Sequence, residues 1–253
     1  MQKRDGREYL IPDWPAHERV QACTTTRIGG VGSAPYDSFN LADHVGDAPA
    51  SVEQNRHLLR QDWHLPSAPV WLTQIHGRGI VDLPTSRPLP CEADASFTAE
   101  RGVVCAVLTA DCLPLLFSDP QGRAVAAVHA GWRGLAAGVI EAMVEHYLAA
   151  VSGLHATDLL VWLGPAIGPD SFEVGRDVQE SFTARYRDAA QAFRETGQQS
   201  WYADIYRLAR LALAACGVDR VYGGEWDTCA DPRFYSYRRD RQTGRMASLI
   251  WRN

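Results

Sequence analysis

The chain has 253 residues, of which 46% are hydrophobic and 22% charged, and its net charge is −5 with neutral histidines. These are ordinary values for a globular protein that can bury a sizeable core. The acidic balance and the scattered arginines give no electrostatic reason to expect a nucleic-acid or membrane partner. The N-terminal segment MQKRDGREYLIPDWP lacks the apolar centre of a signal peptide, and no apolar run is long enough to span a bilayer. We therefore expect a cytoplasmic protein.

Predicted elements alternate between strands and helices from residue 103 onward. A β-branched apolar run predicts a buried strand at residues 103–109, and a second strand follows at 113–117. The sequence DPQG at 119–122 is a strong turn signal, so a returning strand at 124–128 completes a hairpin that runs directly into HAGWRG. Further patterns predict helices at 135–151, 176–187 and 203–215, and strands at 159–163 and 221–223.

The chain shows no internal repeat, and its most linker-like stretch, SRPLPCEADAS at 86–96, is closely flanked by apolar segments. We expect a single domain covering residues 1–253, folded as an α/β (α+β) sandwich with mixed β-sheets. The six cysteines include no C-x-x-C pair. In the expected compartment they would stay reduced, most of them as small buried side chains.

Three short segments combine a metal-binding side chain with Gly or Pro: TQIHG at 73–77, TADCLP at 109–114 and VHAGWRG at 128–134. Their ligands, His76, Cys112 and His129, fall at or near the ends of predicted strands, where loops of α/β proteins converge on sites. Two imidazoles and a thiolate form an open site that selects zinc or copper and leaves one coordination position free. Asp111, next to Cys112, is a candidate for orienting a ligand or moving protons.

The simpler interpretation is that these are isolated structural residues. A single His near a strand end is usually structural or exposed, and a single Cys in an apolar strand is usually part of the core. The spacing between the three residues also matches no compact zinc motif. The other six histidines lie in polar or helical contexts and are predicted to be surface or capping residues.

Two loops carry arginines suited to an anionic substrate. Residues 24–41 form a Gly-rich loop with Arg27 and Asn40, and YSYRRDRQTGR at 235–245 places four arginines close together. Guanidinium groups bind phosphate in a bidentate manner, so Arg27, Asn40, Arg133 and Arg238 are the candidate substrate-binding residues. The alternative for 235–245 is a solvated hairpin turning at 242–244. In an extended strand Arg238 and Arg239 would face opposite sides, so that one of them faces the pocket.

Together, segments spread over residues 22–252 resemble one family closely. They include TTRIGGVG, PVWLTQIHG, ADASFT, CAVLTADCLPLLF, AVHAGWRGLAAGVIE, WLGPAIGPDSFEVG and YSYRRDRQTGRMAS. The chain resembles the bacterial YfiH-type proteins, historically described as polyphenol oxidases or laccase-domain proteins. The resemblance implies that His76, Cys112 and His129 bind zinc. It also implies an α/β sandwich that has been compared with deamidating toxins using a Cys-His pair.

The same resemblance implies a purine nucleoside enzyme. Cys112, His129 and the neighbouring Asp111 are its candidate catalytic residues. Its substrates would be phosphate and a nucleoside: adenosine, inosine or S-methyl-5′-thioadenosine in phosphorolysis, and adenosine in deamination. Some family members are linked instead to editing of peptidoglycan precursors that carry serine in place of alanine. The oligomeric state is left open.

Three rival functions follow from the residues. A multicopper oxidase needs many histidines, often as H-x-H pairs, but none of the eight histidines are separated by one residue. A single copper bound in vitro would remain an alternative, because copper(II) binds such sites more tightly than zinc. A metal-free hydrolase would use Cys112 as nucleophile and His129 as base, which leaves His76 without a role. A binding protein with structural zinc would need a fourth ligand, and none is evident.

Overall fold

Two large β-sheets pack face to face in the computed structural model, which describes residues 1–86, 88–197 and 199–253. The first sheet is antiparallel, with strand order β1–β2–β3–β14–β6. Its strands are β1 (Gln2–Arg4), β2 (Arg7–Leu10), β3 (Val20–Thr25), β14 (Met246–Arg252) and β6 (Val104–Thr109). Arg87, in the stretch predicted to be linker-like, lies outside the described residues.

The second sheet has six strands in the order β13–β9–β7–β8–β5–β4, with parallel pairs at both edges and antiparallel pairs between them. Its strands are β13 (Arg220–Gly223), β9 (Leu160–Leu163), β7 (Leu113–Ser118), β8 (Val125–Ala130), β5 (Ala95–Thr98) and β4 (Ile80–Asp82). The strands predicted at 103–109, 113–117, 124–128, 159–163 and 221–223 and the β7–β8 hairpin are confirmed. The prediction of an α/β sandwich with mixed sheets is confirmed as well.

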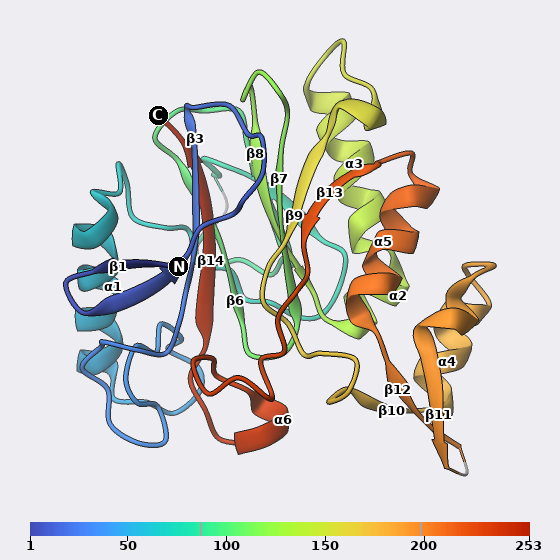
Figure 1. Ribbon diagram of the computed structural model, residues 1–253. Coiled ribbons are helices and arrows are strands. Elements are labelled where there is room, and N and C mark those ends of the chain that lie inside the picture. Colours follow the sequence, from blue (N-terminus) through green and yellow to red (C-terminus); the bar gives the residue numbers. More distant parts are fainter. Residues whose placement is uncertain (87, 198) are drawn as a thin grey trace.

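Helices cover the outer faces of both sheets, so the molecule has four layers (Figure 1). Helix α1 (Pro49–Trp63) packs on the first sheet, and α2 (Trp132–Ala137), α3 (Val139–Ala150) and α5 (Ile205–Ala215) pack on the second. The predicted helix at 135–151 is divided because Gly138 adopts a φ of 95° and caps α2. Glycine tolerates this left-handed conformation without a steric penalty.

Strand alternation determines which side chains reach the interior between the sheets. In β8, Ala126, Val128 and Ala130 face the helices, whereas Val125 and Ala127 face the other sheet. Because the side chains of a strand alternate with a period of two, His129 shares the inward face with Val125 and Ala127. The hairpin therefore directs an imidazole into the end of the sheet sandwich.

A smaller unit lies beside the helix layer, formed by β10 (Glu173–Gly175), β12 (Ser200–Ala203), β11 (Phe193–Gly197) and helix α4 (Arg176–Thr183). The segment predicted as an extended strand around Arg238 and Arg239 is instead helix α6 (Tyr237–Asp240). The Ser236 side chain accepts a hydrogen bond from the Arg239 N–H, which is the N-cap contact that stabilises a first helical turn. The alternative, a hairpin turning at 242–244, is not formed either, and the helix determines which arginines face the site.

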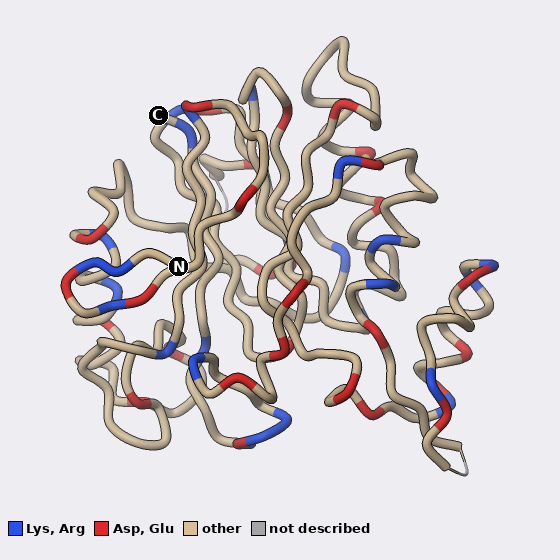
Figure 2. The backbone as a smooth tube through the Cα atoms, in the orientation of Figure 1, with Lys and Arg blue, Asp and Glu red and all other residues tan. Residues whose placement is uncertain are grey.

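All six cysteines are free, but only Cys23 and Cys105 are buried, so the prediction that most of them would be buried is wrong. His64 caps the C-terminus of α1 in a left-handed conformation and His155 caps a short 3₁₀ turn, which confirms the capping prediction for these two histidines. No helix within the described residues is long and apolar enough to cross a membrane. Figure 2 shows acidic and basic residues intermixed along the backbone.

Candidate active site

His129 lies near the end of β8, almost fully buried at 3% exposure. Its Nδ1 atom lies 2.8 Å from Oδ1 of Asp94, a residue with no exposed surface. If Nδ1 carries the proton that this carboxylate accepts, the other ring nitrogen, Nε2, is left with its lone pair free for a metal. Asp94 directly precedes β5, which pairs with β8, so the sheet itself holds the carboxylate beside the ring.

His76 comes from a loop that wraps around the same carboxylate. The backbone N–H groups of Ile75, His76 and Gly77 donate to Asp94 at 3.3, 2.9 and 2.7 Å. Successive N–H groups directed at one anion form a concave binding site, and here His76 takes a left-handed φ of 59° to complete it. Asp94 therefore positions the backbone of one histidine and the ring of the other.

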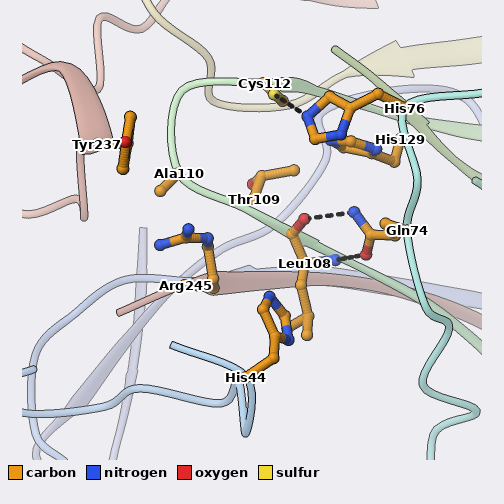
Figure 3. A pocket seen from close by; sticks show the side chains of 10 residues that line it. All are labelled: His44, Gln74, His76, Leu108, Thr109, Ala110, Cys112, His129, Tyr237 and Arg245. Carbon is orange, nitrogen blue, oxygen red and sulfur yellow. Dashed lines mark hydrogen bonds between the residues drawn. The ribbon is translucent and has the colours of Figure 1, made fainter. Parts of the chain in front are cut away.

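Gln74 fastens this loop to the first sheet. Its amide nitrogen donates to the Leu108 carbonyl at 2.8 Å, and its amide oxygen accepts from the Leu108 N–H at 2.7 Å. Both hydrogen bonds are visible in Figure 3. Because they reach the end of β6, the loop is positioned relative to the turn that carries Cys112.

Cys112 follows directly after Asp111, which adopts a φ of 86° between β6 and β7. The Cys112 sulfur lies 3.8 Å from Nε2 of His76, and the ligand atoms of His76, Cys112 and His129 all lie within 4.8 Å of one another. Figure 3 shows the three side chains converging. The predicted metal ligands are thus brought together from three separate segments.

The three side chains fit a zinc ion. Zn–S and Zn–N bonds of about 2.3 and 2.0 Å at tetrahedral angles place ligand atoms roughly 3.5 Å apart, close to the observed sulfur–nitrogen distance. A Cβ atom added to Gly131 would lie 2.7 Å from the His76 ring and 3.0 Å from the Cys112 sulfur. The glycine of HAGWRG therefore leaves the space in which the ligands converge.

Without a metal, the pKa values of Cys112, His129 and Asp94 are all shifted from their ordinary values. Burial would raise the pKa of Cys112, but the neighbouring His129 and His76 lower it to about 6. Burial would lower the pKa of His129, but the Cys112 thiolate and the Asp94 carboxylate raise it to about 9. The pKa of Asp94, raised by burial, is brought below its ordinary value by hydrogen bonds from His129 and the loop. The site thus favours the thiolate, which is the form that binds metals or attacks as a nucleophile.

Two hollows of about 270 Å³ each meet at the cluster and share His76, Ala110, Cys112 and Tyr237. The first, which we call the arginine hollow, is further lined by His44, Gln74, Leu108, Thr109, His129 and Arg245. The second, the aromatic hollow, is further lined by Asp111, Trp132, Arg133, Ile167, Phe172, Ile205 and Arg238. The cluster is therefore accessible from two sides.

Besides His76 and Cys112, three of the predicted site residues line the aromatic hollow: Asp111, Arg133 and Arg238. Asp111 accepts hydrogen bonds from the Thr228 hydroxyl at 2.7 Å and from the Arg238 backbone N–H at 2.6 Å, so it anchors helix α6. The guanidinium of Arg238 lies over Phe172, and that of Arg133 lies over Trp132. These cations are therefore stacked on the aromatic walls of the hollow.

Arg27 and Asn40, also predicted to bind substrate, line neither hollow. Arg27 pairs with Asp37 and lies over the Tyr235 ring, where it borders a separate surface depression. Asn40 is fully buried, and its side-chain oxygen accepts from the Arg245 N–H at 2.9 Å. The structure thus connects Asn40 to the arginine hollow through a residue that was not selected from the sequence.

Sequence reasoning missed Asp94 and Arg245. Asp94 lies within ADASFT, and its position just before a strand is the signal in the sequence that could have indicated its role. Arg245 was noted among four neighbouring arginines, but only the folded chain shows which of them faces the cluster. Another of these four arginines, Arg241, is exposed.

Comparison with known proteins places the chain and its fold in one family. The model for multi-copper polyphenol oxidoreductase laccase matches residues 21–253. A purine nucleoside phosphorylase of Pseudomonas aeruginosa is 53% identical, over 96% of this chain and 98% of the relative. The purine nucleoside phosphorylase YfiH of Escherichia coli is 50% identical over the same shares.

Solved structures agree with this assignment. The crystal structure of YlmD from Geobacillus stearothermophilus superposes with a TM-score of 0.93 at 32% identity, over 100% of this chain and 98% of that one. A Neisseria meningitidis protein gives a TM-score of 0.90 at 46% identity, over 97% and 99%. The chain therefore belongs to the YfiH-type family of laccase-like proteins, as its sequence motifs predicted.

Proposed function

We propose that the protein is a zinc-dependent purine nucleoside phosphorylase that also deaminates adenosine. The observation that carries the proposal is the open His76–Cys112–His129 cluster at the junction of two hollows. It lies in a chain about half of whose residues are identical to relatives named purine nucleoside phosphorylases. The proposed substrates are adenosine, inosine and S-methyl-5′-thioadenosine, together with phosphate.

His76, Cys112 and His129 would hold the zinc and leave one position open for water or substrate. When bound, zinc would supply a Lewis acid and lower the pKa of a coordinated water to about 7. Asp94 orients His129 and the His76 loop, as its hydrogen bonds indicate. We propose that Asp111 acts by holding Tyr237 and Arg238 at the hollow, and that Arg133 and Arg238 contact the nucleoside.

The remaining assignments belong to the same proposal. Arg27 and Asn40 would support the site from outside the hollows, Asn40 through the backbone of Arg245. We propose that the protein acts in the cytoplasm as a single domain, in keeping with six cysteines that form no disulfide. The described residues contain one group of three metal-binding side chains, which favours a single metal over a multicopper cluster.

One specific observation supports a second candidate function. Cys112, His129 and Asp94 have the chemistry of a nucleophile, its base and an orienting carboxylate, and Asp94 is the third group that such a site requires. A Cys-His hydrolase editing serine-containing peptidoglycan precursors would use this arrangement without a metal. Removing the metal should abolish the nucleoside reactions but leave such a hydrolase active.

The decisive experiment is chromatography of adenosine incubated with the zinc-loaded protein, with and without phosphate. Phosphorolysis should give adenine and ribose 1-phosphate only when phosphate is present, whereas deamination should give inosine in both cases. Elemental analysis should find one zinc per chain, lost in Cys112→Ala, His76→Ala and His129→Ala but retained in the control Cys229→Ala. If neither product formed with zinc-loaded enzyme, the nucleoside assignment would be wrong.

A further inference from the structure

The two hollows that meet at the cluster differ in the chemistry of their walls. The aromatic hollow combines Trp132 and Phe172 with the aliphatic Ile167 and Ile205, and its two arginines already stack on the aromatic rings. Flat apolar walls with adjacent cations suit an aromatic ring system with polar edges. A purine base has this character.

The arginine hollow contains a cation without an acidic partner. Arg245 forms no ion pair with any residue in the described parts of the chain. One of its terminal nitrogens, Nη1, donates to the carbonyl oxygens of Thr243 and Gly244 at 2.9 and 3.0 Å. No hydrogen bond is formed by Nε or the other terminal nitrogen within the described residues. Burial lowers the pKa of Arg245, and the nearby Cys112 and Asp111 offset only part of this effect.

A second group in the same wall also lacks a partner. The hydroxyl of Thr109 is buried, and among the described residues it has no hydrogen-bond partner. Buried hydroxyls are nearly always hydrogen-bonded, so a missing partner calls for a ligand or water. The walls of this hollow contain no carboxylate among the described residues, and their one acidic group, the Cys112 thiol, is a proposed zinc ligand. A guanidinium and a hydroxyl in a wall free of carboxylates suit an oxyanion such as phosphate.

Neither hollow alone accommodates both reactants. Each measures about 270 Å³, below the usual range of roughly 300–1,000 Å³ for small-molecule pockets. Their shared residues His76, Ala110, Cys112 and Tyr237 mark the junction, where the ribose would lie. Reactants entering from the two hollows would meet beside Cys112 and His76.

We propose that the arginine hollow is the phosphate subsite and the aromatic hollow the purine subsite, an arrangement that rests on the proposed phosphorylase function. In phosphorolysis an oxygen of hydrogen phosphate forms a bond to C1′ of the ribose while the bond from C1′ to the purine nitrogen breaks. The electron pair goes to the purine, which takes up the proton of hydrogen phosphate and leaves as the free base. Nucleophile and leaving group on opposite sides of C1′ correspond to the two hollows on opposite sides of the junction.

The inference is tested by direct binding, which needs no turnover. Inorganic phosphate and adenine are titrated separately into zinc-loaded protein by isothermal calorimetry. Replacement of Arg245 by glutamine should weaken phosphate binding roughly tenfold or more, because charge-assisted hydrogen bonds are lost, and should leave adenine binding within about twofold. Trp132→Leu should weaken adenine binding and leave phosphate binding within about twofold. Arg187→Gln, which removes an exposed charge that lines neither hollow, is the control.

Thr109→Val tests the phosphate subsite with a variant that should not change the stability of the fold. The hydroxyl has no protein partner, so its removal should not destabilise the fold, yet phosphate binding should weaken severalfold. If Arg245→Gln does not fold, Arg245→Lys carries the test, because it keeps the charge but not the planar fork. Zinc content is measured for every variant.

The outcomes separate this inference from the proposed function. Weaker phosphate binding in Arg238→Gln, with no change in Arg245→Gln and Thr109→Val, would place phosphate in the aromatic hollow and overturn the inference. That result is compatible with an active phosphorylase. Conversely, phosphate binding that depends on Arg245 in a protein that consumes no nucleoside would support the anion subsite and refute the proposed reaction.

Discussion

Asp94 links two of the three candidate metal ligands through one carboxylate. It lies beside the ring of His129 and accepts the backbone N–H groups of His76 and its neighbours, all from a fully buried position. A carboxylate that holds a ligating imidazole fixes the ring's tautomer and orientation. The geometry of the cluster therefore depends on a residue that itself contacts no metal.

Asp94→Asn should lower zinc affinity by about 10–100-fold, the usual effect of losing such a partner. An amide nitrogen facing Nδ1 of His129 would force the proton onto Nε2, the nitrogen that the metal needs. Competition with a chromogenic chelator measures the affinity. The matched control is Asp82→Asn, since Asp82 pairs with His146 at 2.7 Å on the exposed surface. Equal zinc affinity in both variants would contradict the role of Asp94.

The three candidate ligands could be predicted from residue type, but the residues that position them could not. His76, Cys112 and His129 stand in distinctive segments, and the fold brings them together. Asp111 is a candidate on sequence grounds because it neighbours Cys112, and in the structure its carboxylate holds Thr228 and the α6 backbone. Asp94 lies close to His129 because β5 pairs with β8, and a local sequence pattern does not reveal this pairing.

Cys112 should react as a thiolate in protein stripped of metal. With its pKa at about 6, the thiolate forms as the pH rises through 6, so alkylation by iodoacetamide should increase up to about pH 7 and then level off. An ordinary cysteine, with a pKa of about 8.5, would keep accelerating to higher pH. Burial raises the pKa of Cys105 to about 12, so that thiol should stay unmodified. Mass spectrometry identifies the labelled residue, and a steady increase above pH 8 would disprove the low pKa.

At the scale of elements, helix α6 shows where pattern reading was wrong. The stretch around Arg238 and Arg239 was predicted as a strand, with the two side chains on opposite faces. It forms a single helical turn because Ser236 caps it and Asp111 accepts the Arg238 N–H. Arg238 lines the aromatic hollow, whereas Arg239 donates to the carbonyl oxygens of Thr228 and Phe234. A four-residue helix is too short for periodicity to identify.

Arg239→Ala should therefore destabilise the fold, and Arg241→Ala should not. Arg239 holds loop carbonyls that would lose their partner, at a cost of about 1–3 kcal/mol, whereas Arg241 is exposed. Urea unfolding gives the free energy of unfolding for both variants. Indistinguishable midpoints would mean that Arg239 does not stabilise this loop. The zinc content of both should be unchanged, because neither touches a ligand.

Longer elements were predicted well because they contain enough residues to show a hydrophobic periodicity. The β7–β8 hairpin follows from its apolar runs and the DPQG turn, and α5 follows from its helical spacing. The break at Gly138, which separates α2 from α3, was missed because an apolar face continues across it. Here the glycine's left-handed conformation, rather than hydrophobicity, decides where the helix ends.

At the scale of the whole molecule, the cluster lies where both sheets and their connecting loops meet. Cys112 follows β6 of the first sheet and precedes β7 of the second, His129 belongs to β8, and His76 is fastened to β6 through Gln74. A metal held by these three residues would therefore connect both halves of the sandwich. Side chains of both sheets also share one apolar cluster, which favours cooperative unfolding.

Removing zinc should lower the melting temperature while leaving a single unfolding transition. Metal that binds only the folded state at about 100 times its dissociation constant contributes roughly 2.7 kcal/mol. At about 2–4 °C per kcal/mol for a protein of this size, the melting temperature should fall by roughly 5–10 °C. Differential scanning calorimetry with and without a chelator measures the shift, and Cys112→Ala should be insensitive to the chelator. Two transitions, only one of which responds to the chelator, would show that the chain folds as two units and that the metal stabilises just one.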